Sequence, residues 1–265
     1  MLLLSTLDVC KMLALVTTDA LTLIDPATLK NAPSSVPSCQ NLLSKPIATA
    51  CAPDNSTLFI ASASNIQRYD PSSNSLHIVH STDSVDSITH FLAKDKGNTL
   101  IFSSSQIVHV LDCTSGNISK SFDSHKAPIT SLALSNDCTL LATTSAGAAH
   151  VHNLSHSSHT VLRGLPLAGA NVNTCAFHIH SRTRLLLGVG RHLLVYDITR
   201  PSGPLKTITM SDGITGEVDF VACSPFSKTL VAFATIAGHV FLVDLDKEKS
   251  YVVFVLFDFM LFTLP

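Results

Sequence analysis

The chain has 265 residues, a length that allows one large domain or two ordinary ones. Only 14% of the residues are charged, 46% are hydrophobic and the formal net charge is −2, which excludes a disordered acidic or basic tail. Residues 119–210 carry eight basic and three acidic residues, but the basic ones are scattered singly. This pattern does not indicate a nucleic-acid-binding surface, so we expect no nucleic-acid partner.

The N-terminal segment MLLLSTLDVC is apolar, and we predict a β-strand there rather than a signal peptide. It contains no basic residue, and Asp8 interrupts the apolar stretch early. The seven cysteines are isolated, odd in number and without a C-x-x-C pair, which is typical of reduced thiols in a protein of the cytoplasm or nucleus. Cys51 and Cys223 occupy the repeat position that Leu134 fills in another unit, so we expect small apolar core positions there.

Short β-like runs recur along the chain, and each ends at an Asp or Asn. Successive end residues are separated by 45, 42, 41, 44 and 47 positions, which indicates an internal repeat. The end residues are Asp25, Asp70, Asp112, Asn153, Asp197 and Asp244.

Each repeat is predicted to contain four short strands. In residues 128–164 the runs PITSLALS, TLLATTS, AHVHN and HTVLRG follow one another, with turns at Asn136-Asp137 and Ala146-Gly147. The runs are rich in Val, Ile, Thr and Leu and carry no apolar stripe of helical period. Four strands in forty-odd residues correspond to one blade of a β-propeller.

Several short motifs in these repeats resemble motifs of the WD-repeat family. Ser124-His125 resembles the Gly-His element that precedes the first strand of a blade. The runs SNDCTLLATTS (135–145) and APDNSTLFIAS (52–62) resemble the central run of the repeat, and Tyr-Asp ending at Asp70 and at Asp197 stands where the family has Trp-Asp. The resemblance covers nearly the whole chain.

The resemblance implies an all-β fold, a β-propeller of four-stranded blades, with structural roles for His125, Asp70 and Asp197. No Trp-Asp is present, so the family's hydrogen-bonded tetrad of His, Ser or Thr, Asp and Trp is expected to be incomplete in every blade.

About six blades are accounted for, and we assign residues 1–249 to the propeller. Seven blades of about 42 residues need roughly 294, so we expect an incomplete seven-bladed propeller, and a propeller that closes with six blades remains the alternative. Because an open propeller exposes strand edges, residues 2–9 are a candidate closing strand for the last blade. The apolar tail 250–265 is broken by Asp258 and is shorter than a membrane-spanning helix, so we expect no membrane partner. It is either the outer strand of the last blade or the mark of a truncated gene product.

The histidines are the candidates for metal binding. His150 and His152 alternate on one predicted strand, which places both imidazoles on one face, as a zinc site requires. His178 and His180 do the same near a strand end. No third ligand is indicated by spacing, and His152 occupies the repeat position of Tyr196. We therefore expect structural histidines and no metal.

No catalytic residue or cofactor is predicted. There is no G-x-S-x-G nucleophile motif, and no Cys has a nearby His with an orienting group. The letters GVGRHL (188–193) are similar to a glycine-rich phosphate loop, but they lie between two predicted strands with no following helix, which favours a β-turn. We expect a protein that is not an enzyme.

The expected function is that of a protein-interaction scaffold. Residues 121–162 and 183–200 resemble the propeller of the WD-repeat adaptors that attach γ-tubulin ring complexes to spindle poles for microtubule nucleation. This resemblance implies γ-tubulin complex or spindle-associated proteins as partners and a location at the cytoskeleton or microtubule organising centre. In those adaptors a separate helical region binds γ-tubulin, so this chain is expected to localise without recruiting the complex alone.

Two alternatives remain open. In the first, the chain is a WD-repeat subunit of a ubiquitin ligase or of a trafficking assembly. In the second, it is an enzyme that uses a histidine-bound metal in the propeller channel. As partner-contact residues we nominate Lys126, Arg191 and His192, because they place charge at loop positions in the basic part of the chain.

Overall fold

The structure is a computed structural model. It describes residues 3–7, 12–17, 20–24, 39–42, 44–52, 54, 56–70, 73–82, 87–156, 158–166, 170–211, 216–247 and 251–255. Asp25, Lys249 and residues 256–265 of the predicted tail lie outside the described residues.

The described residues form an all-β, β-propeller-like architecture, as the repeat predicts. They build six four-stranded antiparallel sheets, and each sheet takes four strands that are consecutive in the chain. The helical element among them is one turn of 3-10 helix, η2 (Asp95–Gly97). No helix in this part of the chain has the length and apolar character needed to cross a bilayer. Contacts divide the chain into two compact units, with the boundary between Asp123 and Ser124.

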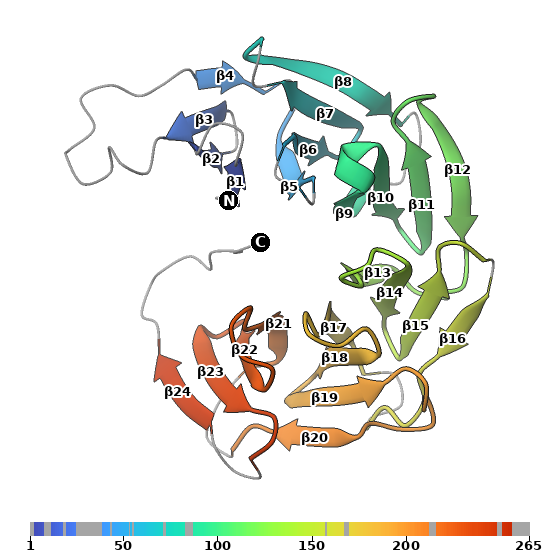
Figure 1. Cartoon of the computed structure of the whole chain (residues 1–265), viewed down its shortest axis with the longest axis vertical. Coiled ribbons are helices and arrows are strands. Elements are labelled where there is room, and N and C mark those ends of the chain that lie inside the picture. Colours follow the sequence, from blue (N-terminus) through green and yellow to red (C-terminus); the bar gives the residue numbers. More distant parts are fainter. Residues whose placement is uncertain are drawn as a thin grey trace. The chain divides into compact units, whose positions relative to one another are not determined.

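The first unit contains three sheets, whose strands follow chain order (Figure 1). Its first sheet comprises β1 (Leu3–Leu7), β2 (Met12–Val16), β3 (Ala20–Ile24) and β4 (Cys39–Asn41). Its second comprises β5 (Pro46–Cys51), β6 (Leu58–Ser62), β7 (Asn65–Asp70) and β8 (Ser75–Ser81). Its third comprises β9 (Ile88–Lys94), β10 (Thr99–Ser104), β11 (Ile107–Asp112) and β12 (Asn117–Phe122).

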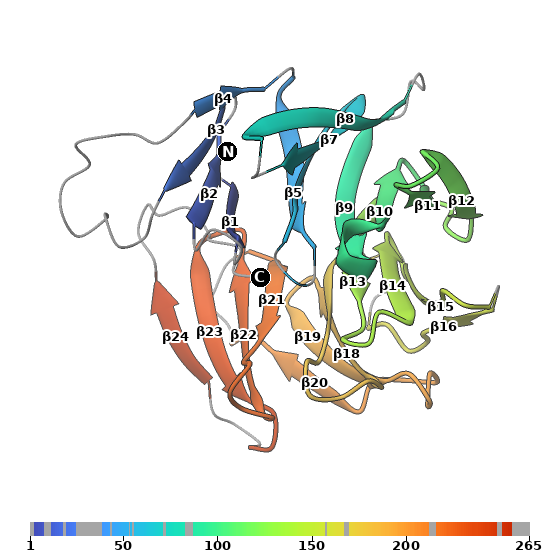
Figure 2. The same cartoon turned by 45° about the horizontal axis from the view of Figure 1, so that its top comes forward.

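The second unit also contains three sheets. Its first sheet comprises β13 (Ile129–Leu134), β14 (Leu140–Ser145), β15 (Ala148–Asn153) and β16 (His159–Val161). Its second comprises β17 (Val172–Phe177), β18 (Arg184–Val189), β19 (His192–Asp197) and β20 (Lys206–Thr209). Its third comprises β21 (Val218–Cys223), β22 (Leu230–Thr235), β23 (His239–Asp244) and β24 (Tyr251–Val255), which lie side by side in Figure 2.

The central strands are buried on both faces because neighbouring sheets of a unit pack against each other. All five residues of β6 are buried, as are the last five of β18, whereas most of the outer strand β12 is exposed. Strands buried on both faces read as continuous apolar runs rather than as alternating ones. The first strands of adjacent sheets are also joined by hydrogen bonds, for example from Asn173 Nδ2 on β17 to the carbonyl oxygen of Val218 on β21, at 3.3 Å.

The predicted repeat ends mark the ends of the third strands. Strands β7, β11, β15, β19 and β23 end at Asp70, Asp112, Asn153, Asp197 and Asp244. The side chains of these residues accept hydrogen bonds in the following turn: Asp197 Oδ1 accepts from the backbone nitrogen of Thr199 at 3.0 Å and from its hydroxyl at 2.7 Å. Such Asx turns end the strand locally, which explains why an Asp or Asn recurs at this position.

The two chain ends differ in how they compare with the prediction. The closing-strand assignment of residues 2–9 is wrong, because Leu3–Leu7 pairs with β2 of its own sheet, Leu3 opposite Val16 and Leu7 opposite Met12. A short connection favours pairing with the next strand along the chain. At the other end, β24 pairs antiparallel with β23, so residues 251–255 form the outer strand of the last sheet.

The GVGRHL segment is a two-residue hairpin, as predicted. Val189 pairs directly with His192, so Gly190 and Arg191 form the turn between β18 and β19. Gly190 has a φ of 52°, in the left-handed region that such turns require and that glycine adopts without steric cost.

Candidate functional site

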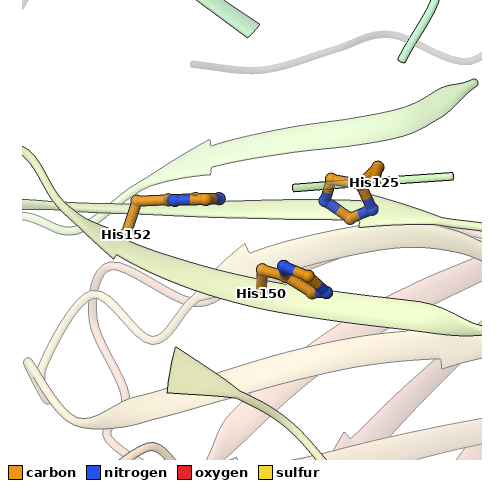
Figure 3. A group of neighbouring side chains, drawn as sticks. All are labelled: His125, His150 and His152. Atoms are coloured by element: carbon orange, nitrogen blue, oxygen red, sulfur yellow. The ribbon is translucent and has the colours of Figure 1, made fainter. Parts of the chain in front are cut away.

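Three buried histidines of the second unit gather beside β15 (Figure 3). His150 and His152 are two positions apart on β15, so both side chains lie on the same face of the sheet. His125 comes from the segment that precedes β13, and 4% of its surface is exposed. One ring nitrogen from each histidine lies within 4.8 Å of the other two. The fold therefore supplies the third ligand that spacing along the chain did not indicate.

Two hydroxyl groups on β14 hold His125 in place. Its Nδ1 lies 2.7 Å from Ser145 Oγ, and its Nε2 lies 2.7 Å from Thr143 Oγ1. Thr143 Oγ1 is also 3.1 Å from His152 Nε2, and a hydroxyl both donates and accepts, so one threonine links the two rings. Each of these bonds contributes about 1 kcal/mol net to stability. The network fastens the segment before β13 to the middle of its sheet.

His152 occupies the position in its sheet that Tyr196 occupies in the next sheet of the second unit. His152 pairs with Leu141 as Tyr196 pairs with Leu185 in the next sheet, which shows that the two residues occupy the same register. An imidazole is thus present where the next sheet has a phenol.

His150 has a ring nitrogen that finds no hydrogen-bond partner in the described part of the chain. The His150 side chain stacks on His125 with 4.4 Å between ring centroids, and on His159 of β16 with 5.3 Å. Its residue surface is 8% exposed, and Nδ1 is buried with no hydrogen-bond partner among the described residues. A buried polar atom that has no hydrogen-bond partner lowers the stability of the fold. A ligand bound to this nitrogen would therefore be stabilising.

Burial keeps the three imidazoles neutral at physiological pH. Desolvation, followed by the neighbouring His150, lowers the pKa of His125 to about 4. Desolvation and the same neighbour lower the pKa of His152 to about 3, and burial lowers the pKa of His150 as well. Neutral imidazole is the form that coordinates a metal ion, so no proton has to be displaced at pH 7.

The second histidine pair does not form a site of this kind. Strand β17 ends at Phe177, so His178 and His180 lie in the following turn rather than on a strand. His178 is buried, with 1% of its surface exposed, whereas His180 is exposed. The expectation of two imidazoles on one strand face is therefore wrong here, because the strand ends three residues before His180.

A second candidate site is formed by the turns that join the first and second strands of the three sheets in this unit. We call it the hairpin rim and define it as residues 135–139, 178–183 and 224–229. Arg182 Nε lies 2.8 Å from Asp137 Oδ2, and Arg182 Nη2 donates to Thr139 Oγ1 at 3.1 Å. His180 Nε2 donates to the carbonyl of Ser224 at 3.2 Å. These contacts join the three turns into one surface.

The hairpin rim presents an aromatic side chain. Phe226 is 97% exposed in the turn between β21 and β22. Its turn is held by Ser224 Oγ, which accepts from the backbone nitrogens of Phe226 and Ser227, both at 3.2 Å. Sequence reasoning missed this residue; the signal was the run SPFSK, which places an aromatic residue inside a predicted hairpin turn.

The nominated partner-contact residues lie in different environments. Lys126 is exposed beside His125. Arg191 is half-buried, and its Nη2 donates to the carbonyl oxygen of Ser211 at 2.7 Å. His192 is also half-buried, with Nδ1 2.9 Å from Thr209 Oγ1 on β20. Lys126 thus points to solvent, whereas the other two contact their own sheet and the segment that follows it.

Asp137 in the hairpin rim gives a pH-dependent prediction. Hydrogen bonds from Ser135 and Thr139, with Arg182 nearby, lower the pKa of Asp137 to about 2. A lowered folded-state pKa stabilises the fold above the unfolded-state pKa of about 4, and that contribution is lost as pH falls through about 2. Because the side chain is 38% exposed and therefore screened, we expect Asp137→Asn to cost about 1 kcal/mol at pH 6.

Urea denaturation of wild type and Asp137→Asn between pH 6 and pH 2 measures this effect. The difference in the free energy of unfolding is expected to shrink between pH 4 and pH 2, where the wild-type carboxylate becomes protonated like the neutral amide. A difference that stays constant over this range contradicts the assignment.

Together these sheets and turns define an all-β, β-propeller-like protein with a buried three-histidine cluster and an exposed aromatic rim. No family model matches the chain, and no curated protein matches it.

Proposed function

We propose that this chain is a non-catalytic protein-interaction scaffold and that the hairpin rim of its second unit is the docking surface. The observation that carries the proposal is Phe226, whose side chain is 97% exposed on a turn held by its own hydrogen bonds. Aromatic residues are enriched among those that dominate binding energy at protein interfaces. A rigid scaffold that presents loops is the usual basis of recognition.

The rim is rigid enough to bind without much reorganisation. Its three turns are fastened to one another by Arg182 and His180. Little conformational entropy is then lost on binding, because the surface holds its shape beforehand. A turn that was free to move would lose part of the binding energy in becoming ordered.

The side chains of the hairpin rim indicate which kind of partner surface it fits. Arg182 has 62% of its side chain exposed, and Lys228 is exposed two residues after Phe226. An apolar ring flanked by cations fits a partner with a hydrophobic pocket bordered by acidic residues. The resemblance in residues 121–162 and 183–200 supports a specific form of the proposal, in which the chain places γ-tubulin ring complexes at spindle poles.

Quantitative affinity purification from dividing cells tests both levels of the proposal. The baits are the wild-type chain, Phe226→Ala and Ile236→Ala. Ile236 is a matched control, because it is 68% exposed and follows β22, whereas Phe226 precedes β22 at the opposite end of the same strand. Loss of an interface anchor costs about 2 kcal/mol, so Phe226→Ala is expected to weaken binding roughly 30-fold.

The possible outcomes distinguish the general scaffold function from its specific form in microtubule nucleation. Recovery of spindle-pole or spindle-associated proteins that depends on Phe226 and not on Ile236 supports both the scaffold function and its microtubule form. Recovery of other proteins with the same dependence supports the scaffold and overturns the microtubule form. Partners that bind equally well to all three baits overturn the hairpin rim as the docking surface.

A further inference from the structure

The three-histidine cluster has the composition of a transition-metal site. Its donors are three imidazole groups, which suit zinc, copper and nickel, and its described hydrogen-bond partners are the hydroxyls of Ser124, Thr143 and Ser145. One nitrogen from each ring lies within 4.8 Å of the others. Catalytic and structural zinc ions are bound by three or four such ligands in a tetrahedral arrangement.

The unpartnered nitrogen of His150 points independently to a ligand. His150 is more than nine-tenths buried, with 8% of its surface exposed, and its Nδ1 has no partner among the described residues. Figure 3 shows the His150 ring directly beside that of His125. A bound cation would satisfy this nitrogen.

The hydroxyl groups around the cluster orient the imidazole rings, as hydrogen-bonding groups next to metal ligands do in known metal sites. Ser145 Oγ lies 2.7 Å from His125 Nδ1, and such a bond to one ring nitrogen fixes the orientation of the other for a metal. Burial keeps the pKa of each imidazole below its usual value, so the rings are neutral at pH 7. The hydrogen bond between His125 Nε2 and Thr143 is exchanged for the metal bond.

We propose that His125, His150 and His152 bind a zinc ion. Zn–N bonds of about 2.0–2.1 Å place tetrahedral ligand nitrogens about 3.4 Å apart, so binding draws the three rings closer together. The ion then fastens the segment before β13 to β15.

Zinc titration of the untagged, metal-free full chain against a competing chelating dye tests the proposal. We expect one zinc ion per chain and a higher midpoint of thermal unfolding when zinc is present. His150→Phe keeps a ring in the space but removes both nitrogens. It is expected to weaken zinc affinity more than about 100-fold, beyond the effect of losing an outer-shell partner.

His178→Phe is the matched control. His178 is also a buried histidine of this unit with a buried nitrogen that has no described partner, but it is not part of the cluster. Zinc stoichiometry and affinity are expected to stay unchanged in this variant. Equal zinc binding by wild type and His150→Phe, or no binding by wild type, overturns the proposal.

A spectroscopic readout keeps the test decisive if His150→Phe does not fold. In the wild-type chain labelled with nitrogen-15 histidine, zinc is expected to shift the ring resonances of His125, His150 and His152 and to leave that of His178 unchanged. Shifts confined to exposed histidines such as His156 overturn the site. This inference does not depend on the scaffold function, because zinc binding and partner recovery are measured separately.

Discussion

Replacing Phe233 by Ala is expected to lower the free energy of unfolding by about 3–5 kcal/mol. Phe233 on β22 has 1% of its surface exposed, and it lies directly opposite Phe241 on β23. The two rings stack with 4.6 Å between centroids and 5° between planes. Truncation removes buried apolar surface and this aromatic contact and leaves a cavity in the core that the last two sheets share.

Phe226→Ala is the control for this prediction, because it makes the same chemical change in the turn that precedes the same strand. Since 97% of Phe226 is exposed, its truncation is expected to change the free energy of unfolding by less than about 0.5 kcal/mol. Urea denaturation followed by far-ultraviolet circular dichroism measures both variants. Equal losses in the two variants contradict the packing described for β22.

Gly188→Ala is expected to destabilise the second unit by about 1–3 kcal/mol through overpacking. Gly188 is the fifth of the six residues of β18, and a β-carbon there would be 2.7 Å from Thr174 Cγ2 and 2.7 Å from Val218 Cγ1. Val218 belongs to the adjacent sheet, so the added methyl group forces two packed sheets apart. The absence of a side chain at Gly188 lets the two sheets approach closely.

Two further variants test whether the steric clash at Gly188 causes the expected loss of stability. Gly203→Ala adds the same methyl group where no atom lies within 4 Å, so it is expected to be neutral within about 0.5 kcal/mol. Combining Gly188→Ala with Val218→Ala removes one of the clashing groups, and the double-mutant cycle should show a favourable coupling between the two sites. Strict additivity of the two changes argues against the contact as the source of the loss.

Much of the fold follows from local signals in the sequence. The spacing of Asp and Asn residues located the ends of five third strands, because these side chains form Asx turns with the residues that follow. The GVGRHL turn was predicted from its position between two β-like runs, and an apolar run indicated the strand at 251–255. The pairing of β1 was predicted incorrectly, because an apolar run carries no information about which sheet edge it will join.

The candidate site was only half visible in the sequence. His150 and His152 were recognised as a pair, since strand geometry alone places alternate residues on one face. His125 joins them because the segment before β13 folds back over β14, and a contact between residues this far apart depends on the sheet as a whole. Arg191 and His192 were nominated for their charge and loop position, but the structure surrounds them with groups of their own chain.

The sequence by itself therefore determined the number and spacing of the strands in each repeat, because turn chemistry and apolar runs act over a few residues. Only the tertiary structure decided which side chains meet. Three histidines converge because the segment before β13 folds back onto its own sheet, and three turns join into a rim because consecutive sheets of the second unit pack against one another. That packing buries apolar area regardless of where the polar groups lie, so the position of each polar contact is a consequence of the fold.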